Sequence, residues 1–284
     1  MRKEVIRETD FSVTELPRTR WAQFKDLLKH QFLNLVKISC LQTVFNMPLL
    51  VWAILFVILL TTVNPEGTYV VILVGSGILI PCVAISNIGL SGMFYCLKRM
   101  AYSDGLFAAS SYFVGMKEEW KKGLVLGLLQ GLAAGVALAG TTFLYFYTAV
   151  NPWVIGLGIT LLVILYFVMT MVNYYSLAQT AVYSNKTGVI IKNSFLMSLM
   201  RFPKHLLLFL LHPGLAITGY VGMCFIPSVG VILSYVWLAL FVILNSIGLL
   251  AWMLFILTSF DKFINKENYP DYVGKGLYKE SKED

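Results

Sequence analysis

Residues 112–131 read YFVGMKEEWKKGLVLGLLQG, and the chain changes from charged to apolar in the middle of this stretch. Five charged side chains lie between Lys117 and Lys122, and burying them in hydrocarbon would be very unfavourable. From Gly123 onward the residues are mostly apolar, as in a membrane span. The stretch therefore predicts a charged helix at a membrane surface that continues into a membrane-spanning helix.

The composition of the whole chain agrees with a membrane protein. Of its 284 residues, 58% are hydrophobic and only 13% are charged, and the mean hydropathy is +0.74. About 20 apolar residues of helix cross the hydrocarbon core, and six stretches are long enough: 40–63, 69–97, 123–149, 152–182, 206–226 and 231–259. Each must be helical, because lipid offers no hydrogen-bond partner to a free backbone group. We therefore expect an all-α integral membrane protein with six transmembrane helices.

The Lys and Arg residues predict which side of the membrane each connection faces. The links at 64–68, 151–152 and 227–230 contain none of them. All 22 lie in 1–37, 98–122, 186–204 and 262–284, which hold 8, 5, 4 and 5 respectively. Since positively charged connections stay in the cytoplasm, we expect both termini to be cytoplasmic and the six helices to form three hairpins in a bacterial plasma membrane. The net charge of +7 then reflects topology and contact with anionic lipid headgroups, and no nucleic-acid binding is expected.

The same patterns divide the chain into a polar cytoplasmic tail, 1–20, a membrane domain, 21–260, and a charged cytoplasmic tail, 261–284. Within the membrane domain, the segment that starts at Gly105 aligns without gaps on the segment that starts at Gly188. Each has a glycine, an amphipathic stretch, a basic cluster and a Leu-rich span, and a weaker third copy begins at Phe24. These copies predict a repeat of three helical hairpins, at about 21–102, 105–182 and 188–260.

Two cytoplasmic connections have the pattern of amphipathic elbow helices, here called the first elbow (105–122) and the second elbow (188–204). Apolar side chains recur at helical spacing in both, and the candidate partner contacts are Phe113, Met116 and Trp120 with the basic Lys121 and Lys122, and then Phe195, Leu199 and Phe202. Pro203 is expected to mark a bend into the next span, because the residue before a proline leaves the helical conformation. Such helices can lie in the headgroup layer or dock a protein, and the pattern is the same for both.

The sequence has no pattern typical of catalysis. All 15 acidic residues lie outside the six spans or at their ends, so no carboxylate site for ion-coupled transport is predicted at membrane depth. The motifs of P-loop ATPases, H-E-x-x-H metalloproteases and G-x-S-x-G hydrolases are missing. The three histidines and four cysteines are spread along the chain without the spacing of a metal or disulfide framework. We expect no enzymatic activity, no cofactor and no metal.

A few polar or helix-breaking residues lie within the predicted spans. Asn87 is expected to hydrogen-bond across helices. His212 is followed by Pro213 and a glycine, which frees backbone carbonyls and predicts a kink or a local binding site. These three residues are the candidate polar or kink sites within the membrane. The small residues of the second span, among them Gly75 and Gly77, predict a close approach to a neighbouring helix.

Two runs of sequence resemble a known family. The run PCVAISNIGLSGMFYCLKR at 81–99, with the elbow that ends in KEEWKKGLVLGLL, and the run IIKNSFLMSLMRFPKHLLLFLL at 190–211 are similar to the YesL family of bacterial membrane proteins, also called the domain-of-unknown-function 624 family. The resemblance covers residues 20–215, although Ser86 and Asn87 stand where members often have Gly-Pro, and 64–80 is longer than usual. Members tend to be encoded beside oligosaccharide importers. The resemblance therefore implies an accessory membrane subunit of a carbohydrate ABC importer, and it implies no catalytic residue.

Three functions remain open from the sequence. The first is a non-enzymatic accessory, assembly or regulatory subunit whose elbows bind the permease subunits of the importer. The second is a permease that works with a separate ATPase, although the second elbow lacks the acidic residue that a permease coupling loop would carry. The third is a lipid-interacting membrane scaffold unrelated to transport.

Overall fold

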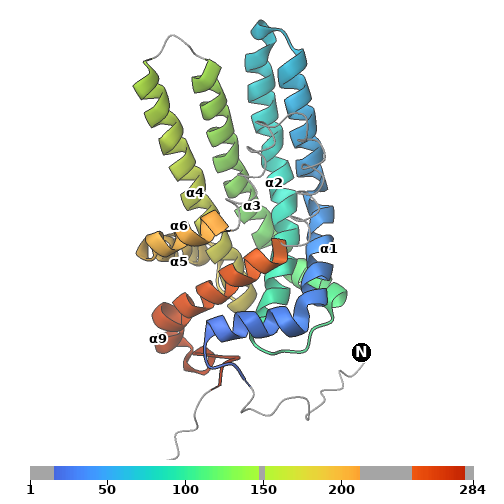
Figure 1. Cartoon of the computed structure of the whole chain (residues 1–284), viewed down its shortest axis with the longest axis vertical. Coiled ribbons are helices and arrows are strands. Elements are labelled where there is room, and N and C mark those ends of the chain that lie inside the picture. The colour runs from blue at the N-terminus through green and yellow to red at the C-terminus, as the bar shows by residue number, and fades with distance from the viewer. Residues whose placement is uncertain (1–15, 147–150, 212–244, 279–284) are drawn as a thin grey trace, which may run out of the picture. The chain divides into compact units, whose positions relative to one another are not determined.

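The computed structural model describes residues 16–146, 151–211 and 245–278, and this part of the chain is helical, without a β-strand. The helices are α1 (Arg20–Thr62), α2 (Pro65–Ala101), α3 (Ala108–Phe146), α4 (Pro152–Val182), α5 (Thr187–Met200) and α6 (Phe202–Leu211) (Figure 1). Residues 245–260 form a further helix, which continues through the π-helical turn η2 (Asp261–Asn265) into α9 (Lys266–Asn268). The short 3₁₀ helix η3 (Pro270–Tyr272) follows. The expected all-α class is confirmed.

Five of the described helices are long and apolar enough to cross a membrane: Arg20–Leu60, Gly67–Ala101, Ala108–Leu144, Pro152–Val182 and Asn245–Asn268. The first four contain the first four predicted spans almost entirely, and the fifth contains the described part of the span predicted at 231–259. The span predicted at 206–226 lies mostly outside the described residues, and α6 covers only its first part. The described helices are thus compatible with a multi-pass membrane protein.

The first three helices are much longer than a bilayer is thick. They contain 43, 37 and 39 residues, which at 1.5 Å per residue is about 55–65 Å of helix against about 30 Å of hydrocarbon. Charged side chains gather at one end of each helix, at 25–37 in α1, 98–99 in α2 and 117–122 in α3. Each helix therefore joins a charged segment to an apolar span without a break, and α3 is continuous through Gly123.

The chain forms two compact units, each assembled from separate stretches of sequence. Among the described residues, unit 1 comprises 16–40, 94–113, 206–211 and 245–278, and unit 2 comprises 41–93, 114–146 and 151–205. Within unit 2, the apolar parts of α1 and α2 form one hairpin, and α3 and α4 form another (Figure 1). In the first hairpin Trp52 Nε1 donates a hydrogen bond of 2.8 Å to the Gly75 carbonyl. In the second, Gln130 Nε2 donates to Thr170 Oγ1 at 2.9 Å.

A row of glycines brings α3 close to α2 within unit 2. Gly123, Gly127, Gly131 and Gly135 recur every fourth residue and therefore share one face of α3. A Cβ atom added to any of them would lie 2.6–3.2 Å from an atom of α2, a distance at which a neighbour has to move. Small residues of this kind let membrane helices approach closely. The approach of α3 to α2 thus depends on glycines of α3. The close approach predicted at the small residues of α2 is present at Gly75, where a Cβ atom would collide with the Phe56 ring of α1, but not at Gly77, where it would meet nothing within 4 Å.

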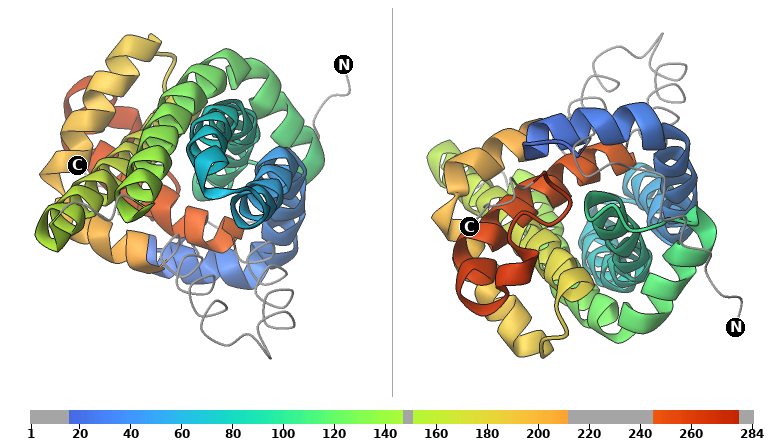
Figure 2. Two further views of the ribbon diagram at one scale, coloured as in Figure 1. Left: turned by 90° about the horizontal axis from the view of Figure 1, so that it is seen from above. Right: turned by 90° about the horizontal axis from the view of Figure 1, so that it is seen from below.

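Unit 1 has an apolar core formed by the first part of α1, the end of α2, the start of α3 and the C-terminal helix. Its largest fully buried side chains are Leu35, Ile38, Phe94, Leu97, Tyr112, Trp252 and Phe260. Figure 2 shows, from below, the beginning of α1 (blue) alongside the C-terminal helix (red). Apolar packing therefore holds together segments that are far apart in the sequence.

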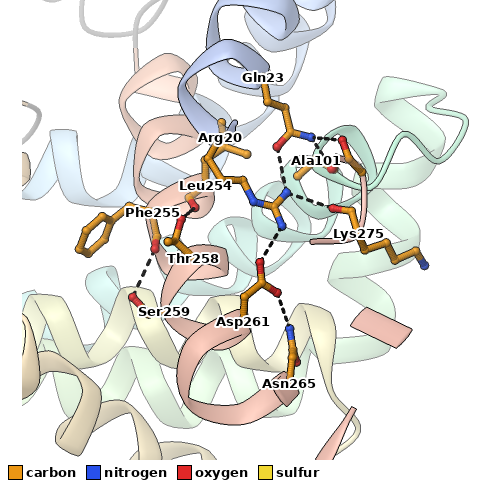
Figure 3. Close-up of polar contacts among 11 residues, drawn as sticks. Arg20, Gln23, Ala101, Leu254, Phe255, Thr258, Ser259, Asp261, Asn265 and Lys275 are labelled. Atoms are coloured by element: carbon orange, nitrogen blue, oxygen red, sulfur yellow. Dashed lines mark hydrogen bonds and ion pairs between the residues drawn. The ribbon is translucent and has the colours of Figure 1, made fainter. Parts of the chain in front are cut away.

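A polar cluster beside that core joins the start of α1 to the C-terminal segment (Figure 3). Arg20 Nη2 lies 3.1 Å from Asp261 Oδ2, and Arg20 Nη1 donates to Gln23 Oε1 at 2.9 Å and to the Lys275 carbonyl at 3.0 Å. Gln23 Nε2 in turn donates to the Ala101 carbonyl at 2.7 Å. The Arg20 and Asp261 side chains are only 11% and 20% exposed. The ion pair is therefore largely shielded from water.

Residues 261–278, the described part of the expected C-terminal tail, pack against the other segments of unit 1. Tyr278 N donates to the Pro17 carbonyl at 3.2 Å, and Lys275 Nζ lies 4.8 Å from the centroid of the Tyr102 ring. Gly276 has a φ angle of +80°, and a Cβ atom there would collide with the Ala101 carbonyl oxygen. Only glycine adopts this conformation readily and leaves that space free.

Candidate docking surface

The second elbow forms α5 and the start of α6, and α5 packs against α4 within unit 2. The inward face of α5 consists of Ile190, Ser194, Met197 and Ser198, all of them buried. Gln179 Nε2 of α4 donates a hydrogen bond of 2.8 Å to Ser194 Oγ. Because a hydrogen bond has a defined direction and length, this buried contact fixes which side of α5 faces α4.

His205 fixes the junction between α5 and α6. Its side chain is fully buried, with Nδ1 2.9 Å from the Ser198 carbonyl oxygen and Nε2 2.9 Å from the Tyr175 hydroxyl. A carbonyl can only accept, so the geometry assigns the ring proton to Nδ1, and Nε2 accepts from Tyr175. The neutral imidazole thereby ties the first turn of α6 to both α5 and α4.

The bend between α5 and α6 falls at Arg201. This residue has φ −122° and ψ 25°, and Phe202 is already the first residue of α6. Pro203 therefore lies in the first turn of α6, where its missing N–H breaks no helical hydrogen bond. The bend expected at the residue before Pro203 is present, one residue earlier than the sequence predicts.

The opposite side of α5 is exposed and mostly apolar, with the exposed Lys192 one turn before Phe195, and it includes the predicted contacts Phe195 and Leu199. The exposed fractions of Phe195, Leu199 and Phe202 are 46%, 49% and 37%. We call the following exposed residues of α5 the α5 face: Val189, Phe195, Leu196, Leu199 and Met200. Phe202 belongs to α6, and its ring packs edge-to-face on Phe167 of α4, with 5.4 Å between the ring centroids. Since the inward side of the helix is anchored by buried hydrogen bonds, the backbone that carries the α5 face is held in one orientation against α4.

The first elbow presents a mixed aromatic and basic surface at the start of α3. Phe113 and Trp120 are 47% and 44% exposed, whereas Met116 is half-buried. Lys121 Nζ lies 5.7 Å from the centroid of the Trp120 ring, and Lys122 Nζ lies 2.8 Å from a glutamate oxygen one turn earlier. Tryptophan and lysine side chains are typical of the headgroup layer of a membrane.

Several polar side chains at the predicted membrane depth of unit 2 pair with one another. Asn87 Oδ1 accepts from Asn173 Nδ2 at 2.8 Å, a hydrogen bond that connects α2 to α4. In a second group, Ser86 Oγ donates to Asn46 Oδ1 at 2.6 Å, and Gln42 Nε2 donates to the same oxygen at 3.0 Å. Asn87, a candidate polar site, thus takes part in helix packing.

The sequence-based candidates and the observed site overlap only in part. Of the candidates within the spans, His212 and Pro213 lie outside the described residues. The residues that anchor α5 were not among the candidates: Tyr175, Gln179, Ser194 and His205. Two of them, Tyr175 and Gln179, are four residues apart in α4 and therefore share one face of that helix.

We expect the anchoring of α5 to weaken in acid. Burial is the main reason that the pKa of His205 falls from 6.5 to about 4, and the Arg201 charge lowers it further, against the hydrogen bond to Ser198. The folded state therefore favours the neutral ring, and its stabilisation is complete above pH 6.5 and lost as the pH falls toward 4. The loss amounts to as much as about 3 kcal/mol.

Hydrogen exchange of the α5 amides measures this effect. Protection should fall between pH 6.5 and pH 4 in the natural protein, and His205→Gln should remove the pH dependence. His30, whose side chain is 59% exposed, provides the control, because His30→Gln should leave the profile unchanged. Equal pH dependence in all three proteins would show that another group controls the elbow.

Among the described residues, no three His, Cys, Asp or Glu side chains gather into a metal site. Comparison of the chain with models of known families, with curated proteins and with solved structures finds no match. These comparisons neither support nor contradict the resemblance to the YesL family, which therefore depends on the two runs at 81–99 and 190–211.

Proposed function

We propose that the chain is a non-enzymatic accessory subunit that binds the permease subunits of a bacterial carbohydrate ABC importer and aids their assembly or regulation. In this proposal it spans the plasma membrane six times with both termini in the cytoplasm, as the Lys and Arg distribution predicts. We propose an importer as the partner because the runs at 81–99 and 190–211 resemble the YesL family. We propose the α5 face as the binding surface because its side chains are exposed and mostly apolar.

The observation that carries the proposal is the anchored, apolar α5 face. Its helix is held in place before any partner binds, so little backbone conformational entropy is lost on binding. Phe195 supplies an exposed aromatic anchor on this face, and aromatic residues often dominate interface energies. A partner helix at the membrane surface could pack against these side chains through small residues of its own.

The packing of unit 2 favours an accessory role over a permease. At Gly127 and Gly131, α3 approaches the backbone of α2 so closely that even a Cβ atom would lie within 3.0 Å of it. Transport sites usually have polar or charged groups facing a cavity at membrane depth. In this unit Asn87 and Asn173 bond to each other, and the amide of Gln42 bonds to Asn46.

The first elbow supports an additional contact with anionic lipid headgroups. Lys121 lies beside the exposed ring of Trp120, and a basic residue near the cytoplasmic surface gains about 1 kcal/mol from anionic lipid. The same contact is expected of a membrane scaffold without a transporter. The two functions therefore differ only in what the α5 face binds.

Co-purification from native membranes tests the proposal. Tagged protein is isolated in mild detergent, and bound proteins are identified by mass spectrometry. We expect the double variant Phe195→Ala/Leu199→Ala to recover about tenfold less permease than the natural protein, because two interface anchors are lost. The matched control is Leu157→Ala/Leu161→Ala on α4, where both side chains are also largely exposed, and it should recover the normal amount.

Other outcomes separate the competing functions. Charge reversal at Lys121 and Lys122 should also weaken recovery of the permease if the first elbow takes part in docking. Recovery of an ATPase without permease subunits would indicate that this chain is itself the permease. Recovery of lipid alone, with no importer subunit, would contradict the proposal and favour the scaffold.

A further inference from the structure

The start of α1 carries an exposed aromatic edge. Trp21, Phe24, Leu28 and Phe32 are three or four residues apart and therefore lie along one side of the helix. Trp21 and Phe32 are 66% and 43% exposed, and the Trp21 and Phe24 rings stack with their centroids 5.5 Å apart. We call these four residues the α1 edge. An exposed apolar row of this kind marks contact with a membrane or with another protein.

The neighbouring side of the same helix is fixed within unit 1. Leu35 and Ile38 are fully buried in the core of that unit. Gln23 Nε2 donates to the Ala101 carbonyl at 2.7 Å and to the Gly276 carbonyl at 3.1 Å. Because these contacts hold one side of the helix inward, the aromatic rings of the α1 edge stay at the surface of unit 1.

Two lysines beside the α1 edge give it a positive charge. Lys25 and Lys29 are exposed, and Lys25 Nζ lies 5.5 Å from the centroid of the Trp21 ring. Asp26 is the only acidic residue between positions 20 and 37, and it lies 3.6 Å from His30. Among the described residues, no carboxylate lies within ion-pair distance of Lys25 or Lys29. The edge therefore places apolar rings next to positive charge.

We propose that the α1 edge is a third elbow, which binds anionic phospholipid at the cytoplasmic surface of the membrane. Its rings enter the boundary between headgroups and acyl chains, and Lys25 and Lys29 contact the lipid phosphates. The first elbow has the same pairing, with Lys121 Nζ 5.7 Å from the centroid of the Trp120 ring.

Charge complementarity favours lipid as the occupant of the α1 edge. Anionic lipid presents phosphate groups along the whole length of a helix at the membrane surface, whereas a protein would need acidic residues at matching positions. In this arrangement the start of α1 runs along the membrane surface before the helix continues into its span. The binding is independent of the proposed importer.

Photo-crosslinking of the full-length protein in nanodiscs tests this contact. The nanodiscs contain equal amounts of phosphatidylglycerol and phosphatidylcholine, and a photoreactive aromatic residue replaces Phe32. We expect phospholipid adducts at position 32, with several-fold more phosphatidylglycerol than phosphatidylcholine. The matched control places the same residue at Asp26, which is 52% exposed on the other side of the helix, and should give several-fold fewer lipid adducts.

Charge reversal isolates the role of the lysines. With the photoreactive residue at position 32, Lys25→Glu/Lys29→Glu should lower the phosphatidylglycerol adducts several-fold and leave the phosphatidylcholine adducts unchanged. The control Lys262→Glu/Lys266→Glu, at two exposed lysines near the C-terminus, should change neither.

Three outcomes overturn the proposal. Position 32 of the protein with its natural lysines could give no more lipid adduct than position 26, and this result does not depend on any charge-reversed variant folding. Equal adducts with the two lipids would show that the edge does not select anionic headgroups. In native membranes, an adduct of position 32 with a protein in place of lipid would identify the α1 edge as a protein-docking surface.

Discussion

Replacing Gly127 by alanine is expected to destabilise unit 2, whereas the same replacement at Gly77 is expected to leave it unchanged or slightly more stable. At Gly127 the new Cβ atom would lie 2.6 Å from Ala84 Cα and 2.8 Å from Asn87 Cβ. The first of these is a backbone atom, which cannot move without shifting α2. Overpacking of this kind destabilises proteins by about 1–3 kcal/mol.

Gly77 provides a matched control, because it also lies inside a helix. A Cβ atom there would meet nothing within 4 Å, so only the higher helix propensity of alanine acts, worth up to about 1 kcal/mol. Unfolding of the purified protein in mixed micelles of a mild detergent and dodecyl sulfate measures both changes. Equal effects at Gly127 and Gly77 would show that α2 and α3 do not cross as closely as described.

Replacing Asp261 by alanine is expected to destabilise unit 1 by about 3 kcal/mol, because it leaves the shielded charge of Arg20 without its counterion. Arg20 would keep only two neutral acceptors, Gln23 Oε1 and the Lys275 carbonyl. Asn265 Nδ2 would lose its acceptor as well, at present 2.8 Å away on Asp261 Oδ1. The loss should appear as reduced hydrogen-exchange protection of the C-terminal helix.

Two further variants isolate the cause of that loss. The double variant Arg20→Met/Asp261→Leu removes both charges and should recover most of the stability, because apolar residues can replace a buried ion pair. Asp26→Ala removes one member of an exposed pair, His30–Asp26, whose side chains are 59% and 52% exposed, and should change the stability by less than about 1 kcal/mol. If Asp261→Ala resembles Asp26→Ala, the cluster does not hold unit 1 together.

The spans could be predicted from sequence because hydropathy is a local property. Each long apolar run must become a helix in lipid whatever its neighbours are, and the runs at 40–63, 69–97, 123–149 and 152–182 indeed lie almost entirely in α1 to α4. The continuity of α3 through Gly123 also follows from local sequence, since no helix-breaking residue separates its charged and apolar parts.

The contacts that join segments could be predicted only in part. Arg20 and Asp261 are 241 residues apart, and nothing local to either residue marks the other as its partner. The glycine row of α3 can be recognised in the sequence, since residues four apart lie on one helix face. The close helix approach predicted from the sequence is instead based on the small residues of α2. In α5 the serines 194 and 198 lie on the buried face, where Ser194 accepts from Gln179 of α4 and the Ser198 hydroxyl donates to the Phe195 carbonyl of its own helix.

The proposed contact between the α5 face and a permease subunit lies at the membrane surface. Site-specific photo-crosslinking in cells that express the importer measures this contact most directly, with a photoreactive residue at Leu199 and, as a control, at the exposed Leu161 of α4. We expect position 199 to form an adduct with a permease subunit, identified by mass spectrometry, and position 161 to form none. Adducts with lipid alone at position 199 would contradict the claim.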